Sequence, residues 1–208
     1  NPQGQPFNLA PFLCGTEGTL AFTLSATLKL VEIPKAKGLA CIHFSSLDEA
    51  MVATPVILKH QPAAIELMGK RLLALTENHI AHQRNRQWIE GAPEAVLAVE
   101  FLGDSDAKIT ACFKKLIADL KQQHLGYAYP VISTADAANV WAIRKAGLGL
   151  LMGVKNTQKP VAVIEDSAVA PSDLFNYTKA ISAIMAREKI NCVYYGHASV
   201  GLLHLRPE

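Results

Sequence analysis

From Gly38 onward, short runs of apolar and β-branched residues alternate with amphipathic helical stretches, and turn residues mark each change of period. This alternation indicates a chain of mixed α and β structure. The expected strands span residues 38–44, 63–68, 94–102, 127–132, 161–165, 190–195 and 201–206. The expected helices span residues 46–60, 71–88, 105–123, 135–151 and 172–189.

Successive β-α-β units with connections of this length fit an α+β fold, in which ferredoxin-like units form a largely antiparallel sheet with helices on one face. A doubly wound parallel sheet is the alternative. It is weakened because no phosphate-binding glycine-rich turn opens any of the helices. Ser46 followed by Glu49 predicts a capping box at the start of the first of these helices.

The composition excludes several classes of partner. The chain has 20 basic and 18 acidic residues, a formal charge of +2, and no basic run, so it offers no electrostatic footprint for nucleic acid. It also contains no apolar stretch near the ~20 residues of a spanning helix and no signal peptide, so we expect no transmembrane segment. The cysteines form no CxxC pair, which indicates reduced thiols in a cytoplasmic protein; they are Cys14, Cys41, Cys112 and Cys192.

Three segments could carry chemistry, and the first is the loop Gly15-Thr16-Glu17-Gly18-Thr19. Its two glycines bracket hydroxyl and carboxyl residues, so the backbone could approach a ligand closely and offer N–H groups to an anion. A plain turn before a strand is the alternative interpretation.

The second segment is the ending, in which His197 and His204 are separated by a short stretch that contains Gly201. If the chain makes a hairpin or a bulge there, two imidazoles could bind one metal ion. Two satisfied, buried histidines are the alternative.

The third segment is a helix in which Arg144 is flanked by apolar residues. A guanidinium group has the planar fork that binds a carboxylate through two hydrogen bonds. An exposed arginine on a helix surface is the alternative, and composition does not separate the two.

In this order and spacing, the segments resemble the FAD-linked oxidase family, which includes D-lactate, glycolate and D-2-hydroxyglutarate dehydrogenases. GTEGTL is similar to the family's G-[ST]-E-G-T-L loop, and residues 64–68 resemble its A-[IV]-E-L-[ML]-D strand, with Gly69 in place of Asp. Trp141 to Arg144 looks like the family's helix whose arginine holds the substrate carboxylate. Residues 163–171 are similar to its E-D-x-A-V-P stretch, with one residue inserted before the proline.

The ending resembles the family's G-H-x-G-D-G-N-x-H signature, whose histidines bind a divalent metal in many members. His197 and His204 match both histidines, whereas Ser199, Val200 and Leu202 replace a glycine, the aspartate and the asparagine. The H-A-S-V-G form looks like the long members in which an iron–sulfur domain follows on the same polypeptide.

The resemblance also implies a domain organisation. Residues 1–34 would be the tail end of the FAD-binding domain, and residues 35–208 the C-terminal substrate domain, truncated before its last motif. The chain begins without Met and ends directly after an apolar run, which agrees with a piece of a longer polypeptide. The family's pyrophosphate loop would lie before it, and the S-x-E-H-G motif, with the third metal ligand and the catalytic base, after it. No catalytic residue is therefore expected within the fragment, which alone should be inactive.

The implied parent enzyme oxidises a small 2-hydroxyacid to the 2-oxoacid and passes electrons from FAD to an iron–sulfur domain or another acceptor. Arg144 would bind the substrate carboxylate, His197 and His204 would bind a divalent metal such as Zn or Mn, and Gly15 to Thr19 would touch FAD. The parent would be cytoplasmic or peripheral to the inner face of the membrane.

Two other functions stay open. A non-catalytic ligand-binding or assembly module that retains the fold would explain the lost aspartate and asparagine. A flavin enzyme that acts on an aryl alcohol or an amino-sugar precursor is disfavoured by Arg144, because a neutral substrate needs no carboxylate clamp.

Overall fold

The computed structural model describes residues 7–155 and 158–208. The chain divides into two compact units, Asn1–Ile33 and Pro34–Glu208. Each unit is described by itself.

The first unit contains one short helix, α1 (Ala10–Leu13), and its described residues after this helix form turns and extended chain. Large apolar side chains of this unit are exposed: Phe7, Leu9, Phe12, Leu13, Leu20, Phe22, Leu24, Leu28, Leu30, Val31 and Ile33. Within its described residues, the unit therefore has no hydrophobic core of its own.

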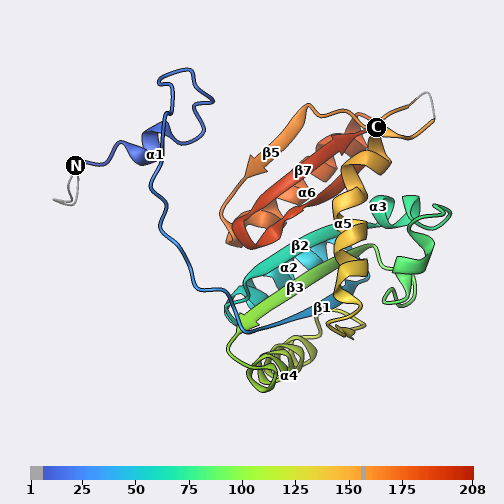
Figure 1. Cartoon of the computed structure of the whole chain (residues 1–208). Coiled ribbons are helices and arrows are strands. Elements are labelled where there is room, and N and C mark those ends of the chain that lie inside the picture. Colours follow the sequence, from blue (N-terminus) through green and yellow to red (C-terminus); the bar gives the residue numbers. More distant parts are fainter. Residues whose placement is uncertain (1–6, 156–157) are drawn as a thin grey trace. The chain divides into compact units, whose positions relative to one another are not determined.

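The second unit is built on a seven-stranded sheet with the strand order β4-β1-β3-β2-β6-β7-β5 (Figure 1). All neighbouring strands pair antiparallel. The strands are β1 (Ala36–Phe44), β2 (Ala64–Gly69), β3 (Ala95–Gly103), β4 (Val131–Ile132), β5 (Ile164–Ala168), β6 (Cys192–His197) and β7 (Leu202–Pro207). The longer helices are α2 (Leu47–Leu58), α3 (Lys70–Leu75), α4 (Asp106–Gln122), α5 (Ala137–Met152) and α6 (Leu174–Arg187).

The strand order confirms the predicted ferredoxin-like arrangement. Helix α2 connects β1 to β2, and β3 lies between these two strands; helix α4 connects β3 to β4, and β1 lies between them. Helix α6 connects β5 to β6 in the same way, with β7 between them. The fold therefore contains three split β-α-β units in one antiparallel sheet.

Helices α2, α4 and α6 pack on one face of the sheet, as expected. Their side chains Met51, Leu116 and Leu174 belong to the same buried cluster as Ile42 and Leu97 of the central strands. This cluster is the main core of the unit.

The opposite face of the sheet is also covered. Leu39 and Val96, which alternate with the residues of the main core, pack with Leu72 of α3 and Ile143 of α5. Figure 1 shows α5 crossing in front of the sheet, whereas α2 lies behind it. Helices thus lie on both faces of the sheet, because β1 and β3 carry apolar side chains that point alternately to one face and to the other.

Two elements are shorter than the sequence predicted. The helix expected over 71–88 ends at Leu75, where the guanidinium of Arg86 donates to the carbonyl oxygen of Leu73, and only a 3-10 turn, η1 (Gln83–Arg86), follows. The strand expected over 127–132 pairs regularly only at Val131 and Ile132, because Pro130 has no N–H to donate.

The predicted helix start at Ser46 is confirmed, since the Ser46 hydroxyl accepts a hydrogen bond from the backbone N–H of Glu49 at 3.1 Å. The amphipathic helix expected over residues 105–123 is also confirmed as α4, which buries four apolar residues: Ile109, Phe113, Leu116 and Leu120. Among the described helices, none combines the length and the apolar composition that crossing a membrane requires.

Candidate functional site

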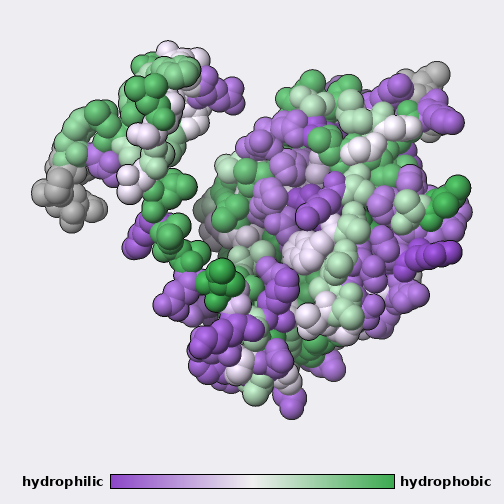
Figure 2. Space-filling model, in the orientation of Figure 1, coloured by the Kyte–Doolittle hydropathy of each residue, from purple (hydrophilic) through white to green (hydrophobic). Residues whose placement is uncertain are grey.

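A group of polar side chains lies on the face of the sheet that α5 covers. We call it the histidine cluster; it consists of Glu66, Arg144, Glu165, Asp166, Tyr195, His197, His204 and Arg206. Figure 2, in the orientation of Figure 1, shows hydrophilic surface on this face beside α5.

The strand register explains why these residues meet. Glu66 of β2 lies directly opposite His197 of β6, and Tyr195 of β6 lies opposite His204 of β7. Because residues two apart on a strand share a face, these four side chains lie on the same side of the sheet.

The carboxylate of Glu66 joins two of the site residues that the sequence predicted. Its Oε2 lies 2.9 Å from Nε and 2.8 Å from Nη2 of Arg144, and its Oε1 lies 2.7 Å from Nδ1 of His197. The side chains of Arg144 and Glu66 are only 12% and 13% exposed, so this ion pair is largely shielded from water. The structure thus places Arg144 inside the protein and next to His197.

The two predicted metal ligands lie close together. The ring centroids of His197 and His204 are 5.3 Å apart, and the rings meet edge to face. Two imidazoles that bind one tetrahedral ion at about 2.1 Å have centroids roughly 5 Å apart. The separation of the rings therefore matches that of two ligands of one ion, whereas the described residues whose donor atoms all lie within 4.8 Å of one another are Glu165, Asp166 and His204, without His197.

His204 is surrounded more tightly than His197. Its Nδ1 lies 2.7 Å from Oδ1 of Asp166 and 3.7 Å from Oε1 of Glu165, and these three residues could together supply a metal with donors. Burial lowers the pKa of His204, and the charge of Asp166 opposes this shift. A neutral imidazole is the form that binds a metal.

The carboxylate of Glu165 is held from the opposite side. Arg206, only 2% exposed, forms a two-pronged ion pair with it, and the Nε of Arg206 donates to the hydroxyl of Tyr195 at 3.2 Å. A buried guanidinium needs such partners, so this contact orders the strand edge beside His204.

A glycine turn returns the chain from His197 to His204. Residues 198–200 form a 3-10 turn, η3 (Ala198–Val200), and Gly201 follows with φ +71°. A Cβ on Gly201 would lie 1.9 Å from the carbonyl oxygen of Val169. Only glycine fits at this position, and the tight hairpin holds the two histidines in register.

We expect Gly201→Ala to destabilise the protein by roughly 3 kcal/mol or more, because it adds both a left-handed strain and a backbone clash. Gly149→Ala in α5 is the matched control: its Cβ would meet nothing within 4 Å, and it should stabilise the helix by about 0.5–1 kcal/mol. Denaturant unfolding of both variants measures the difference. Similar stabilities would show that the turn tolerates a side chain.

Several residues of the cluster were not predicted as site residues. Glu66, Glu165 and Asp166 lie in segments that carried the resemblance. Tyr195 and Arg206 were not singled out as candidate site residues. The signal was present in the spacing, since Tyr195 and His197 are two apart within one strand, as are His204 and Arg206 in the next.

The predicted cofactor loop, Gly15 to Thr19, lies in the first unit. Gly15 and Gly18 both have φ +79°, and a Cβ on either would meet nothing within 4 Å. The Thr19 N–H donates to the carbonyl of Thr16 at 2.9 Å, so the loop is a tight turn with an open backbone. Such a turn fits close approach to an anionic ligand.

His43 is a structural histidine outside the cluster. It is fully buried, its Nδ1 lies 2.9 Å from the carbonyl oxygen of Cys41, and the backbone N–H of Glu90 donates to its Nε2 at 3.2 Å. The second contact requires an unprotonated Nε2, so the ring is neutral with its proton on Nδ1. Burial lowers the pKa of His43 accordingly.

This burial predicts a pH dependence of stability. The unfolded chain binds a proton at His43 below about pH 6.5, whereas the folded chain binds it only at lower pH. The stabilisation is therefore complete above about pH 6.5 and is lost as the pH falls toward the folded pKa, with a slope of at most about 1.4 kcal/mol per pH unit. Denaturant unfolding between about pH 5 and 7 should show a smaller slope for His43→Gln. An unchanged slope would contradict the assignment.

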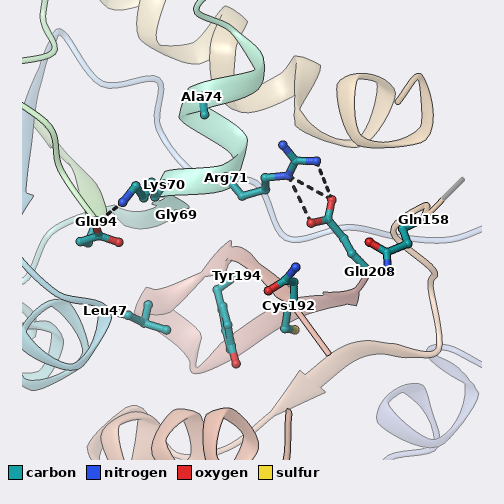
Figure 3. Close-up of a pocket in the computed structure, with 11 residues that line it drawn as sticks. Leu47, Gly69, Lys70, Arg71, Ala74, Glu94, Gln158, Cys192, Tyr194 and Glu208 are labelled. Atoms are coloured by element: carbon teal, nitrogen blue, oxygen red, sulfur yellow. Dashed lines mark hydrogen bonds and ion pairs between the residues drawn. The ribbon is translucent and has the colours of Figure 1, made fainter. Parts of the chain in front are cut away.

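A cavity of about 630 Å³ lies between α3 and strand β6, and none of its described lining residues belongs to the histidine cluster (Figure 3). Its charged residues pair with one another: Lys70 with Glu94, and Arg71 with Glu208. Because these charged groups already neutralise one another, none of them is free to bind a charged ligand in the described part of the cavity. A second cavity, of about 430 Å³, is lined by Trp141, one helical turn from Arg144.

A family model described as FAD linked oxidases, C-terminal domain, matches residues 33–207.

Curated relatives cover nearly the whole chain. D-2-hydroxyglutarate dehydrogenase of Pantoea ananatis is 30% identical over 98% of this chain and 21% of its own length. The enzyme of the same name from Haemophilus influenzae is 31% identical over 100% of the chain and 21% of its own length. Glycolate oxidase subunit GlcD of Bacillus subtilis is 27% identical over 95% of the chain and 40% of its own length. The chain therefore spans about a fifth of the first two relatives.

Proposed function

Since this chain belongs to the family of FAD-linked oxidases, whose C-terminal domain it matches, we propose that it forms the substrate-binding part of a flavin-dependent dehydrogenase. The full-length enzyme oxidises a small 2-hydroxyacid to the 2-oxoacid. The relatives named as D-2-hydroxyglutarate dehydrogenase, glycolate oxidase subunit and D-lactate dehydrogenase support this substrate class.

One observation carries the proposal: Arg144 and His197 bind the two oxygens of a single carboxylate, that of Glu66. The guanidinium of Arg144 and the imidazole of His197, a candidate metal ligand, are therefore separated by the width of one carboxylate, which is the scale of two neighbouring functional groups in a small molecule. A 2-hydroxyacid has its carboxyl carbon bonded directly to the carbon that carries its hydroxyl group. Its binding site therefore needs a cation for the carboxylate close to a metal for the hydroxyl group.

Arg144 has capacity for a further anion. Its Nη2 is 2.8 Å from Oε2 of Glu66, yet it makes no well-directed hydrogen bond within the part of the chain that the structure describes. Its guanidinium carbon also lies 5.3 Å from the ring centroid of Tyr195, which fixes the plane of the fork. In the proposed complex, the substrate carboxylate accepts from this fork and shares it with Glu66.

His197 and His204 would hold a divalent ion such as Zn²⁺ or Mn²⁺, to which Glu165 or Asp166 could add a carboxylate. Such an ion, when bound, lowers the pKa of a coordinated hydroxyl group. The residues of this chain orient the substrate, and a base outside the chain takes the hydroxyl proton.

We assign residues 1–34 to the end of the FAD-binding domain and residues 35–208 to the substrate domain, a proposal supported by the match over residues 33–207 and by the division of the chain after Ile33. Gly15 to Thr19 would form one edge of the flavin site, and FAD, when bound, accepts the hydride from C2 of the substrate.

The electron acceptor would be an iron–sulfur domain on the same polypeptide or another acceptor. The form of the ending, H-A-S-V-G, and the great length of the two D-2-hydroxyglutarate dehydrogenases, of which the chain covers 21% each, support the first of these. The unpaired state of the four cysteines supports a cytoplasmic location.

Turnover of the full-length protein with matched substrates tests the proposal. The panel contains 2-hydroxyacids and the corresponding amides, which keep the hydroxyl group but lose the charge. The proposal predicts activity with the acids and a loss of roughly ten- to a hundredfold with the amides. Equal activity with uncharged alcohols would support the aryl-alcohol alternative, and binding without turnover would support a non-catalytic module.

A further inference from the structure

Glu66 is the residue at which the carboxylate clamp and the metal site meet. We propose that Glu66 is a positioning residue, which fixes the proton of His197 on Nδ1 and so presents the Nε2 lone pair to the metal. The inference rests on the proposed metal site and assigns a role to a residue that is neither a ligand nor a substrate contact.

The hydrogen bond between Glu66 and His197 determines the tautomer. A carboxylate can only accept hydrogen bonds, so Nδ1 of His197, 2.7 Å from Oε1, must be the donor. In the neutral ring, Nε2 then carries the lone pair that a metal requires. Metal-binding histidines in proteins are commonly oriented by a carboxylate in this way.

Arg144 makes this contact rigid. Its Nε and Nη2 both approach Oε2, which leaves Oε1 for His197. Glu66 is also fixed by its strand, since its backbone lies opposite that of His197 in the β2–β6 pair. The carboxylate therefore has two restraints besides the imidazole, and it can impose an orientation on a ring that is itself 46% exposed.

The other histidine provides a contrast. Nδ1 of His204 lies 2.7 Å from Oδ1 of Asp166, but it makes no well-directed hydrogen bond among the described residues. Asp166 is 62% exposed, and no cation braces it in the way that Arg144 braces Glu66 within the described residues. The positioning role is therefore assigned to Glu66 alone.

Nitrogen-15 NMR of the imidazole rings tests the inference on this chain, at about pH 8, where an ordinary imidazole is neutral. His197 should carry its proton on Nδ1. Glu66→Leu combined with Arg144→Leu should shift His197 toward the Nε2–H form, whereas Arg144→Leu alone should not.

His43 is the internal control, because its tautomer is fixed by Cys41 and Glu90 and should be the same in every variant that folds. A proton on Nε2 of His197 in the unchanged chain would overturn the inference, even if the double variant failed to fold. An unchanged His197 in a folded double variant would overturn it too.

Zinc titration of the full-length protein gives the second measurement. The double variant should bind Zn²⁺ about 10–100-fold more weakly than Arg144→Leu. Equal affinities would overturn the role in metal binding. A protein that fails to oxidise 2-hydroxyacids would refute the proposed function but would leave the tautomer result standing, so the two failures are distinguishable.

Discussion

Replacing either His197 or His204 by alanine in the full-length protein is expected to remove most of the bound metal and to lower turnover by more than about 100-fold. Loss of a mere hydrogen-bond partner of a metal ligand already costs about 10–100-fold, and each of these rings would be a ligand itself. The rings lie 5.3 Å apart, so both variants disrupt the same coordination sphere and should behave alike. Elemental analysis and steady-state turnover of each variant provide the measurement.

His60→Ala is the matched control for these variants. His60 pairs with Asp119 of α4 at 2.8 Å and belongs to no part of the histidine cluster, so metal content and turnover should be unchanged. Full activity of the metal-stripped enzyme would show that His197 and His204 are structural histidines. Normal metal content in both alanine variants would lead to the same conclusion.

Arg144→Lys should lower kcat/KM by about ten- to a hundredfold, which corresponds to roughly 1.5–3 kcal/mol of transition-state binding. An ammonium group cannot reproduce the planar, two-pronged grip of a guanidinium on a carboxylate. The lysine would also hold Glu66 less firmly, because Glu66 now accepts a hydrogen bond from Nε of Arg144 and lies 2.8 Å from its Nη2.

Lys145→Ala provides the comparison, because Lys145 is the next residue on α5 but is exposed. It should change kcat/KM much less than Arg144→Lys does. Equal effects of the two substitutions would remove the basis for the clamp.

The sheet was largely predictable from the sequence because most of its strands are short runs of apolar and β-branched residues bounded by turn residues. The consecutive apolar residues within β1 and β3 also contained the signal that both faces of the sheet are buried, which explains α5 on the second face. The region after Leu75 was less predictable. Its apolar spacing is helical, but the helix ends where Arg86 and Thr76 both donate to the carbonyl oxygen of Leu73, and the contact from Arg86 spans 13 positions of sequence.

The candidate site could be predicted only in part. Arg144, His197 and His204 stand out by residue type and by resemblance. Glu66 meets His197 across 131 positions of sequence, and that meeting depends on β2 lying beside β6 in the sheet. Local patterns do not encode strand order, so the carboxylate that joins the clamp to the histidines became visible only in the fold.

Anaerobic mixing of the full-length protein with D-2-hydroxyglutarate, D-lactate or glycolate tests whether it is a flavin-dependent 2-hydroxyacid dehydrogenase. Without an external electron acceptor, electrons from the substrate must remain on the flavin and on any iron–sulfur cluster of the same protein, so the loss of visible absorption reports the first chemical step. At least one of these 2-hydroxyacids should bleach the flavin within a single turnover, and Arg144→Lys should slow the bleaching. A purified protein that binds FAD but whose flavin stays oxidised with every 2-hydroxyacid would contradict the proposed function.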